Sequence, residues 1–157
     1  MNGHESCVLV TGGFDPIHGG HIDYFEDAKL LSTTLIVGVN SDEWLRRKKG
    51  RAFMSWESRK RIIDQMNRVD YVIDFDDSDD TACGAIFKTM ATVGHKKLIF
   101  ANGGDRTAEN TPEEITYGDQ VDFIYEVGGG KVNSSSWILD EWKHPKTDRP
   151  WGWYRVL

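Results

Sequence analysis

Several hallmarks of membrane, secreted and nucleic-acid-binding proteins are missing from this sequence of 157 residues. It contains no run of about 18 apolar residues, the length that crosses a bilayer. The opening MNGHESCVLV lacks the basic segment and long apolar core of a secretory signal. Lys and Arg number 19 against 25 Asp and Glu, and the net charge of −6 argues against general nucleic-acid binding. We expect neither a membrane nor a nucleic-acid partner.

Cysteine is scarce as well. Cys7 and Cys83 are too few for a disulfide framework and lie in segments expected to form regular elements. We interpret both as reduced packing thiols, which favours a cytoplasmic location. A chain of this length buries about two-thirds of its unfolded surface, so it needs neither disulfides nor a structural metal to fold.

Apolar runs alternate with helical segments along the chain, a pattern that predicts a parallel sheet with right-handed crossovers. We expect a polar loop over 41–54, with a helical turn at 42–47. Ligands of such sheets bind outside the carboxyl ends of the strands. The acidic residues at 76–80 follow one of these ends, and we interpret them as a solvated loop and helix start rather than a metal site. The expected strands are 7–11, 35–39, 71–75, 97–101 and 121–127.

The loop after the first expected strand reads TGGFDPIHGGH from Thr11 to His21. Its glycines let the backbone approach a ligand closely, and a helix that begins near Gly19 would attract anions. His18 and His21 could then donate hydrogen bonds to phosphate and stabilise charge that develops at phosphorus. A histidine pair alone would equally fit metal ligation or packing. The Gly-x-Gly-x-x-Gly dinucleotide fingerprint is absent.

The whole string resembles the signature Gly-x-Phe-Asp-x-x-His-x-Gly-His of the nucleotidyltransferase superfamily. This superfamily includes cytidylyltransferases for glycerol, ethanolamine and choline phosphates, and adenylyltransferases for heptose phosphate, phosphopantetheine and nicotinamide mononucleotide. The resemblance covers about residues 7–143. We therefore predict an α/β, Rossmann-like three-layer sandwich over 1–143, with five parallel strands in the order 3-2-1-4-5 and helices on both faces.

Residues 46–61 carry eight of the nineteen Lys and Arg, although the protein is acidic. The order Lys48-Lys49-Gly50-Arg51, then Glu57-Ser58-Arg59, resembles the basic loop and following helix of the superfamily. The resemblance implies a lysine that neutralises the triphosphate and the acceptor phosphate. We favour Lys49 as catalytic, together with His18 and His21. Lys48 and Arg59 are candidates for the substrate phosphate, although Arg59 could instead anchor the loop by pairing with an acid.

Two later loops extend the resemblance. Gly103-Gly104-Asp105 is expected to lie against the base and ribose, and Ser134 to Ser136 to hold a β- or γ-phosphate at a helix start. The cytidylyltransferases have an arginine before this serine motif, whereas this chain has Lys131 and Asn133, so Lys131 is the substitute. The implied nucleotide-binding residues are Gly12, Gly13, Phe14, Asp15, Gly20, Gly103, Asp105, Arg106, Lys131, Ser134, Ser135 and Ser136.

The resemblance implies attack by the phosphate of a small phosphorylated alcohol or sugar on the α-phosphorus of a nucleoside triphosphate, with release of pyrophosphate. CTP is favoured, and ATP with a sugar phosphate such as heptose 1-phosphate is the alternative. Mg²⁺ is expected with the triphosphate, no metal site of the protein's own is predicted, and the assembly is expected to be a homodimer. An alternative of another class is a non-catalytic nucleotide-binding module, which would bind nucleotide and release no pyrophosphate.

The last residues, 144–157, differ from the rest. The string Arg149-Pro150-Trp151-Gly152-Trp153-Tyr154 resembles the opening strand of sugar-isomerase cupins of the mannose-phosphate type. This segment is too short to form a cupin. We interpret it as a tail that packs on the domain or on a dimer mate, with the start of a lost or truncated second domain as the alternative.

Overall fold

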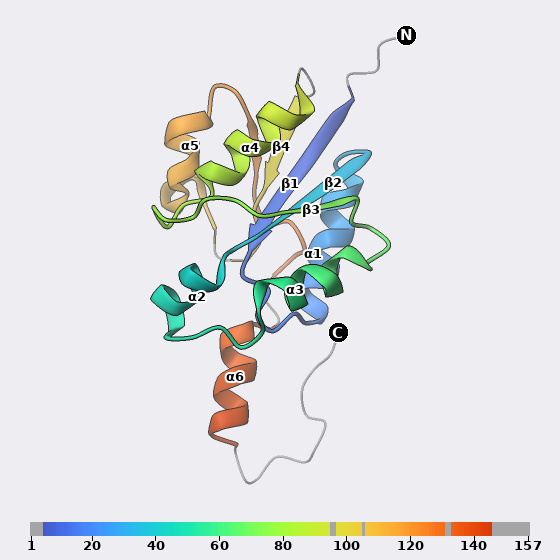
Figure 1. Ribbon diagram of the computed structural model, residues 1–157. Helices are drawn as coiled ribbons and strands as arrows, with labels where there is room; N and C mark the ends of the chain where they lie inside the picture. Colours follow the sequence, from blue (N-terminus) through green and yellow to red (C-terminus); the bar gives the residue numbers. More distant parts are fainter. Residues whose placement is uncertain (1–4, 95–96, 105, 131–132, 146–157) are drawn as a thin grey trace.

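The computed structural model describes residues 5–94, 97–104, 106–130 and 133–145. Figure 1 shows a single sheet with helices on both of its faces. All strand pairs are parallel, and their order, β3-β2-β1-β4-β5, confirms the predicted Rossmann-like α/β fold. The strands are β1 (Ser6–Gly12), β2 (Thr34–Val39), β3 (Tyr71–Ile73), β4 (Lys97–Ala101) and β5 (Asp122–Ile124).

Two apolar clusters fill the spaces between the sheet and its helices. Side chains alternate along β1, so that Val8 joins one cluster and Leu9 the other. Phe25 and Ile63 bring two helices onto the first face, and Ile86 brings another onto the second. The helices are α1 (Gly19–Leu30), α2 (Asp42–Lys49), α3 (Trp56–Asp64), α4 (Cys83–Val93), α5 (Pro112–Tyr117) and α6 (Ser135–Lys143), with a 3-10 turn, η1, over Ala108–Asn110.

The segment expected to be mostly loop holds a helix of eight residues, α2. Ser41 caps it, because its Oγ accepts a hydrogen bond from the backbone N–H of Trp44 at 3.0 Å. Acidic residues occupy the first turn and four basic residues the last, which suits the helix dipole. The helical turn predicted over 42–47 therefore continues to Lys49, and the cluster of positive charge lies at one helix end.

The carboxyl ends of the strands meet at one edge of the sheet, where β1 lies between β2 and β4. The chain leaves β1 toward α1 on one face of the sheet and leaves β4 toward α5 on the other, so the two loops diverge and leave room for a ligand. α6 extends beyond this edge, away from the other helices (Figure 1), and none of its residues is buried. None of the helices in the described ranges has the length and apolar character that crossing a bilayer requires. The expected tail lies outside the described residues from 146 onwards.

Candidate active site

A cavity of about 330 Å³ opens at the carboxyl edge of the sheet. Its wall is formed by the loops that follow all five strands and by the start of α6. Asp105 and Lys131, two of the predicted site residues, lie outside the described residues. The predicted residues that line the cavity are Gly12, Gly13, Phe14, His18, Gly20, His21, Lys48, Gly103, Arg106, Ser134 and Ser135.

The two signature histidines cap the start of α1. Nδ1 of His18 accepts a hydrogen bond from the Gly20 N–H at 3.1 Å, and Nδ1 of His21 accepts one from the His18 N–H at 3.1 Å. Their rings lie against each other, with centroids 3.8 Å apart. An Nδ1 that accepts carries no proton, so the hydrogen bonds assign the proton of each neutral ring to Nε2. Both histidines therefore offer an Nε2–H donor beside the positive end of a helix.

The environment also keeps these rings neutral. Burial, together with the neighbouring His18, lowers the pKa of His21 to about 3. Burial also lowers the pKa of His18 below its usual value. Phe14 packs edge-on against the His21 ring, with centroids 5.0 Å apart, and supplies part of this apolar contact. Near neutral pH the pair can donate hydrogen bonds to phosphate without carrying fixed charge.

Asp15 of the signature turns inward rather than toward the cavity, and only 1% of it is exposed. Its carboxylate accepts hydrogen bonds from the backbone N–H groups of Phe53 at 2.7 Å and Met54 at 2.6 Å. Lys49 pairs with the same carboxylate at 3.0 Å and also donates to the Asp15 carbonyl. Asp15 and Lys49 thus tie the signature loop to residues 49–54, and neither lines the cavity.

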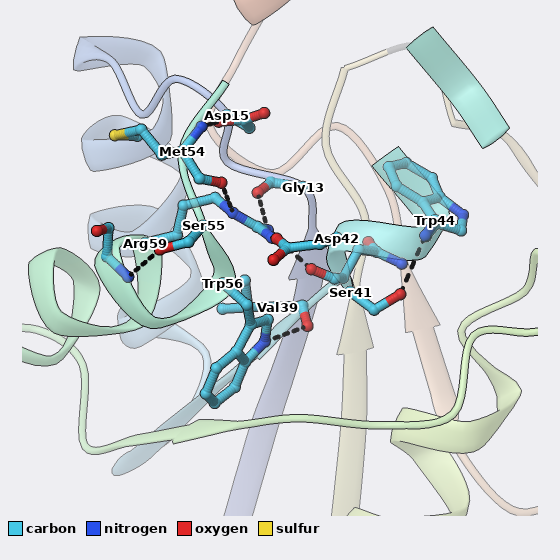
Figure 2. A network of polar contacts seen from close by, with 12 residues as sticks. Gly13, Asp15, Val39, Ser41, Asp42, Trp44, Met54, Ser55, Trp56 and Arg59 are labelled. Carbon is cyan, nitrogen blue, oxygen red and sulfur yellow. Dashed lines mark hydrogen bonds and ion pairs between the residues drawn. The ribbon is translucent and has the colours of Figure 1, made fainter. Parts of the chain in front are cut away.

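Arg59 is completely buried, and Figure 2 shows the polar contacts around it. Its guanidinium donates to the carbonyls of Met54 at 3.0 Å, Gly13 at 2.8 Å and Asn40 at 2.7 Å. It also pairs with Asp42 at 2.6 Å. Arg59 thus lies where an anchor of the loop is expected. It is not placed as a second cation for the acceptor phosphate, because every contact is internal and the side chain does not line the cavity.

Lys48, the neighbour of Lys49, reaches the cavity wall. Its Nζ lies over the indole of Trp44, 4.4 Å from the ring centroid, on the same face of α2. The indole itself points away from the Arg59 network (Figure 2). Of the two adjacent lysines, the structure therefore places Lys48 and not Lys49 where a substrate phosphate could be reached.

Two glycine loops form the opposite wall. A Cβ at Gly103 would lie 2.9 Å from the Val127 carbonyl oxygen, and one at Gly128 would lie 2.9 Å from Cα of Tyr24. Gly128 also has φ of +87°, which disfavours any side chain. The Tyr24 hydroxyl donates to the Ala101 carbonyl, and burial raises its pKa. Glycine at these positions lets both loops pack onto α1 and exposes backbone groups to the cavity.

The serine motif lies next to the signature loop. Ser134 caps α6, because its Oγ accepts from the Trp137 N–H at 3.1 Å. The Ser135 hydroxyl donates to the Pro16 carbonyl at 2.7 Å, which joins residues 119 positions apart. Ser136 is exposed and does not line the cavity. The starts of α1 and α6 thus face one cavity, and both suit anionic groups.

Several residues of this wall were not predicted from the sequence. Tyr24 lies one helical turn after His21, and this spacing could have indicated it. Trp44, Asp80 and Thr81 come from elements whose relative placement no local pattern reveals. Glu113 on α5 is fully buried and accepts from the Ala82 N–H at 2.6 Å and from Arg106 at 3.3 Å. Ala82 and Arg106 both line the cavity, so Glu113 joins two parts of its wall.

Comparisons with known proteins agree with this geometry. Residues 9–126 match the family model described as cytidylyltransferase-like. The chain is 35% identical over 130 residues to the bifunctional protein HldE of Coxiella burnetii, covering 82% of this chain and 24% of that protein. It is 33% identical over 145 residues to HldE of Syntrophotalea carbinolica, covering 88% and 28%. The chain thus spans about a quarter of the length of these relatives.

Solved structures show the same architecture. A lipopolysaccharide core biosynthesis protein from Thermoplasma volcanium superposes with a TM-score of 0.61 at 27% identity, covering 77% of this chain and 95% of that one. A bifunctional NMN adenylyltransferase/ADP ribose pyrophosphatase from Francisella tularensis, complexed with AMP and manganese, superposes with a TM-score of 0.62. This second likeness covers 89% of this chain and 42% of that one, and at 14% identity it shows the fold alone.

Proposed function

The chain belongs to the cytidylyltransferase-like family and is a nucleotidyltransferase, and on this premise we propose that it transfers AMP from ATP to a phosphorylated sugar. The observation that carries the proposal is the pair of Nε2–H donors of His18 and His21 in the cavity. The sequence favoured CTP. The HldE relatives support the adenylyl alternative, with heptose phosphate as the acceptor.

In the proposed reaction an oxygen of the acceptor phosphate attacks the α-phosphorus of the nucleotide. A new phosphorus–oxygen bond forms, the bond between the α-phosphorus and its bridging oxygen breaks, and pyrophosphate leaves with that electron pair. The acceptor phosphate is already ionised near pH 7, so the step requires no general base. The protein contributes in-line positioning and stabilisation of the charge that develops on the α-phosphate.

Each part of the cavity has a role in this scheme. His18 and His21 donate to the non-bridging oxygens of the α-phosphate. Because both rings are neutral, these donors need no counter-ion. The start of α6, with Ser134 and Ser135, receives the departing pyrophosphate. Lys48 neutralises the acceptor phosphate, while Lys49 and Asp15 hold the signature loop in shape. Mg²⁺ enters with the nucleotide and is held by its phosphates and by water.

The glycine loops at Gly103 and Gly128 support a nucleotide site on the side of the cavity next to Tyr24. Backbone groups there can lie against a base without intervening side chains. We assign the base and ribose to this side. A homodimer stays a prediction from the family resemblance.

Pyrophosphate release tests the proposal. The chain is mixed with Mg²⁺, either ATP or CTP, and either heptose 1-phosphate or glycerol 3-phosphate, and the product is identified by mass spectrometry. We expect turnover with ATP and the sugar phosphate. Turnover with CTP and glycerol phosphate alone would contradict the choice of nucleotide and acceptor. Nucleotide binding without pyrophosphate release with either acceptor would favour the non-catalytic module.

A further inference from the structure

The order of the strands divides the cavity wall into two halves. The loops after β4 and β5 supply Gly103, Gly128 and Arg106 on one side, and β1 with the two histidines lies in the middle. The loops after β2 and β3 supply Trp44, Lys48, Asp80 and Thr81 on the other side. If the nucleotide occupies the glycine-lined half, the second half faces the attacking group across the α-phosphate.

The second half has a chemistry unlike the first. It presents the indole of Trp44, the ammonium group of Lys48 and the carboxylate of Asp80. A carboxylate and a phosphate both accept hydrogen bonds, so Asp80 suits a part of the substrate that donates them rather than its phosphate end. Carboxylate oxygens accept hydrogen bonds from hydroxyl groups, and an aromatic face packs against the C–H groups of a sugar ring. A phosphorylated sugar offers groups of all three kinds.

Ion pairs and hydrogen bonds hold these residues in place. The Nε of Arg47 pairs with Asp80 at 3.0 Å, and its Nη2 donates to the Asp77 carbonyl at 2.7 Å. The buried carboxylate of Asp77 accepts from the N–H and the hydroxyl of Ser41, each at 2.7 Å. Ser41 caps α2, the helix that carries Trp44. The turn at 77–80 and α2 are thus joined at both ends, which places Trp44 and Asp80 on the same side of the cavity.

The backbone at Asp80 also distinguishes this turn. Its φ of +61° is left-handed, a conformation that aspartate and asparagine tolerate better than most residues. Replacement of Asp80 by Asn therefore removes the charge of the side chain, while the left-handed backbone conformation stays equally well tolerated. Asp79, the preceding residue, does not line the cavity, and its carboxylate accepts from the N–H and hydroxyl of Thr81, each at 2.9 Å. It provides a matched control.

We propose that Trp44 and Asp80 form the acceptor subsite and select a phosphorylated sugar, whose ring packs on the indole and whose hydroxyl groups donate to the carboxylate. Lys48 lies beside the same ring and takes the phosphate end of that substrate. This inference rests on the proposed function. It adds the two residues that would distinguish a sugar phosphate from a phosphate ester without hydroxyl groups.

The test compares two acceptors, heptose 1-phosphate and ethyl phosphate, with ATP held at saturation. Kinetics are measured for the wild type and for Trp44→Ala, Trp44→Phe, Asp80→Asn and Asp79→Asn. We expect Asp80→Asn to lower the ratio of kcat/KM for the sugar phosphate over ethyl phosphate by about tenfold, because a hydrogen bond to a charged group is replaced by one to a neutral group. Trp44→Ala should lower the same ratio by about tenfold, because the packing of the sugar ring on the indole is lost. Trp44→Phe should retain most of the ratio, and Asp79→Asn should leave it unchanged. The KM for ATP should stay within about twofold in all variants, since these residues lie across the cavity from the nucleotide half.

The outcomes separate this inference from the proposed function. An active wild type whose acceptor ratio is the same in Trp44→Ala and Asp80→Asn would overturn the subsite and leave the proposed function standing. An equal loss with both acceptors would assign the two residues to the fold of α2 rather than to sugar selection. A wild type that releases no pyrophosphate with either acceptor would refute the proposed function, and the subsite would fall with it.

Discussion

The backbone N–H of His18 donates to Nδ1 of His21 at 3.1 Å, so the first histidine of the signature sets the tautomer of the second. His18 in turn accepts from Gly20, and the two rings lie in contact. This arrangement turns two titratable groups into neutral donors with a fixed direction. It also explains the spacing of the pair, because three residues bring Nδ1 of His21 back to the amide of His18 at the start of the helix.

Nitrogen-15 NMR can test this tautomer. At pH 7 both imidazoles should be neutral, with the proton on Nε2, and neither should titrate near 6.5, because burial lowers both pKa values. A His21 signal that titrates near pH 6.5 would contradict the assignment.

Loss of the His21 donor should slow the chemical step. His21→Ala is expected to cut turnover by about 100-fold or more, the usual effect of removing one such donor. The KM for the nucleotide should change much less, because the charge it stabilises develops in the transition state. Steady-state kinetics with thermal unfolding of the variant would check this. Turnover within a few-fold of the wild type would remove His21 from the catalytic group.

Stability should depend on pH through His21. Its pKa is about 3 in the folded chain, against the usual 6.5, so between these values the unfolded chain binds more protons. The free energy of unfolding should therefore fall as the pH drops below 6.5, by up to about 1.4 kcal/mol per pH unit from this group. Urea unfolding of the wild type and His21→Gln between pH 7 and 5 measures the difference. Equal slopes in the two proteins would refute the contribution of His21.

Arg59 should matter for folding rather than for contact with substrate. Arg59→Ala leaves Asp42 and three carbonyls without their partner, and we expect a loss of about 3–5 kcal/mol in the free energy of unfolding. Arg61→Ala, on an exposed position of the same helix, should change it by no more than about 0.5 kcal/mol. If chemical denaturation finds the two variants equally stable, Arg59 is not the anchor described above.

Glu113 should influence the nucleotide through Arg106. Glu113→Gln keeps an acceptor for the Ala82 N–H but removes the charge that faces Arg106, so the KM for ATP should rise while the KM for the acceptor stays the same. Glu113→Ala also leaves that buried N–H unpaired and should cost about 1–3 kcal/mol of stability. The exposed Glu109→Gln is the control. A rise in both KM values would indicate general loosening of the cavity.

Local patterns in the sequence were enough to predict most elements. Ser55 and Ser134 cap helix starts that the structure contains, because a cap acts on amides within three residues of it. Pro112 occupies the first turn of α5, where its fixed φ suits a helix. The fourth strand lies at 97–101 as expected. The ends of the strands were less predictable. β5 holds three residues where 121–127 was expected, because pairing with the neighbouring strand sets the limits.

The sequence by itself determined the order of the elements and the signature loop, because hydrophobic periodicity and capping are local effects. The order of the strands in the sheet came from the resemblance of that loop to the superfamily signature. Only the tertiary structure decided that Lys48 rather than Lys49 lines the cavity, since Asp15 pairs with Lys49. It also decided that Arg59 is an anchor, and that Trp44 and Asp80 share a wall. These outcomes depend on which distant groups meet a side chain in the folded protein, and no spacing along the chain contains that information.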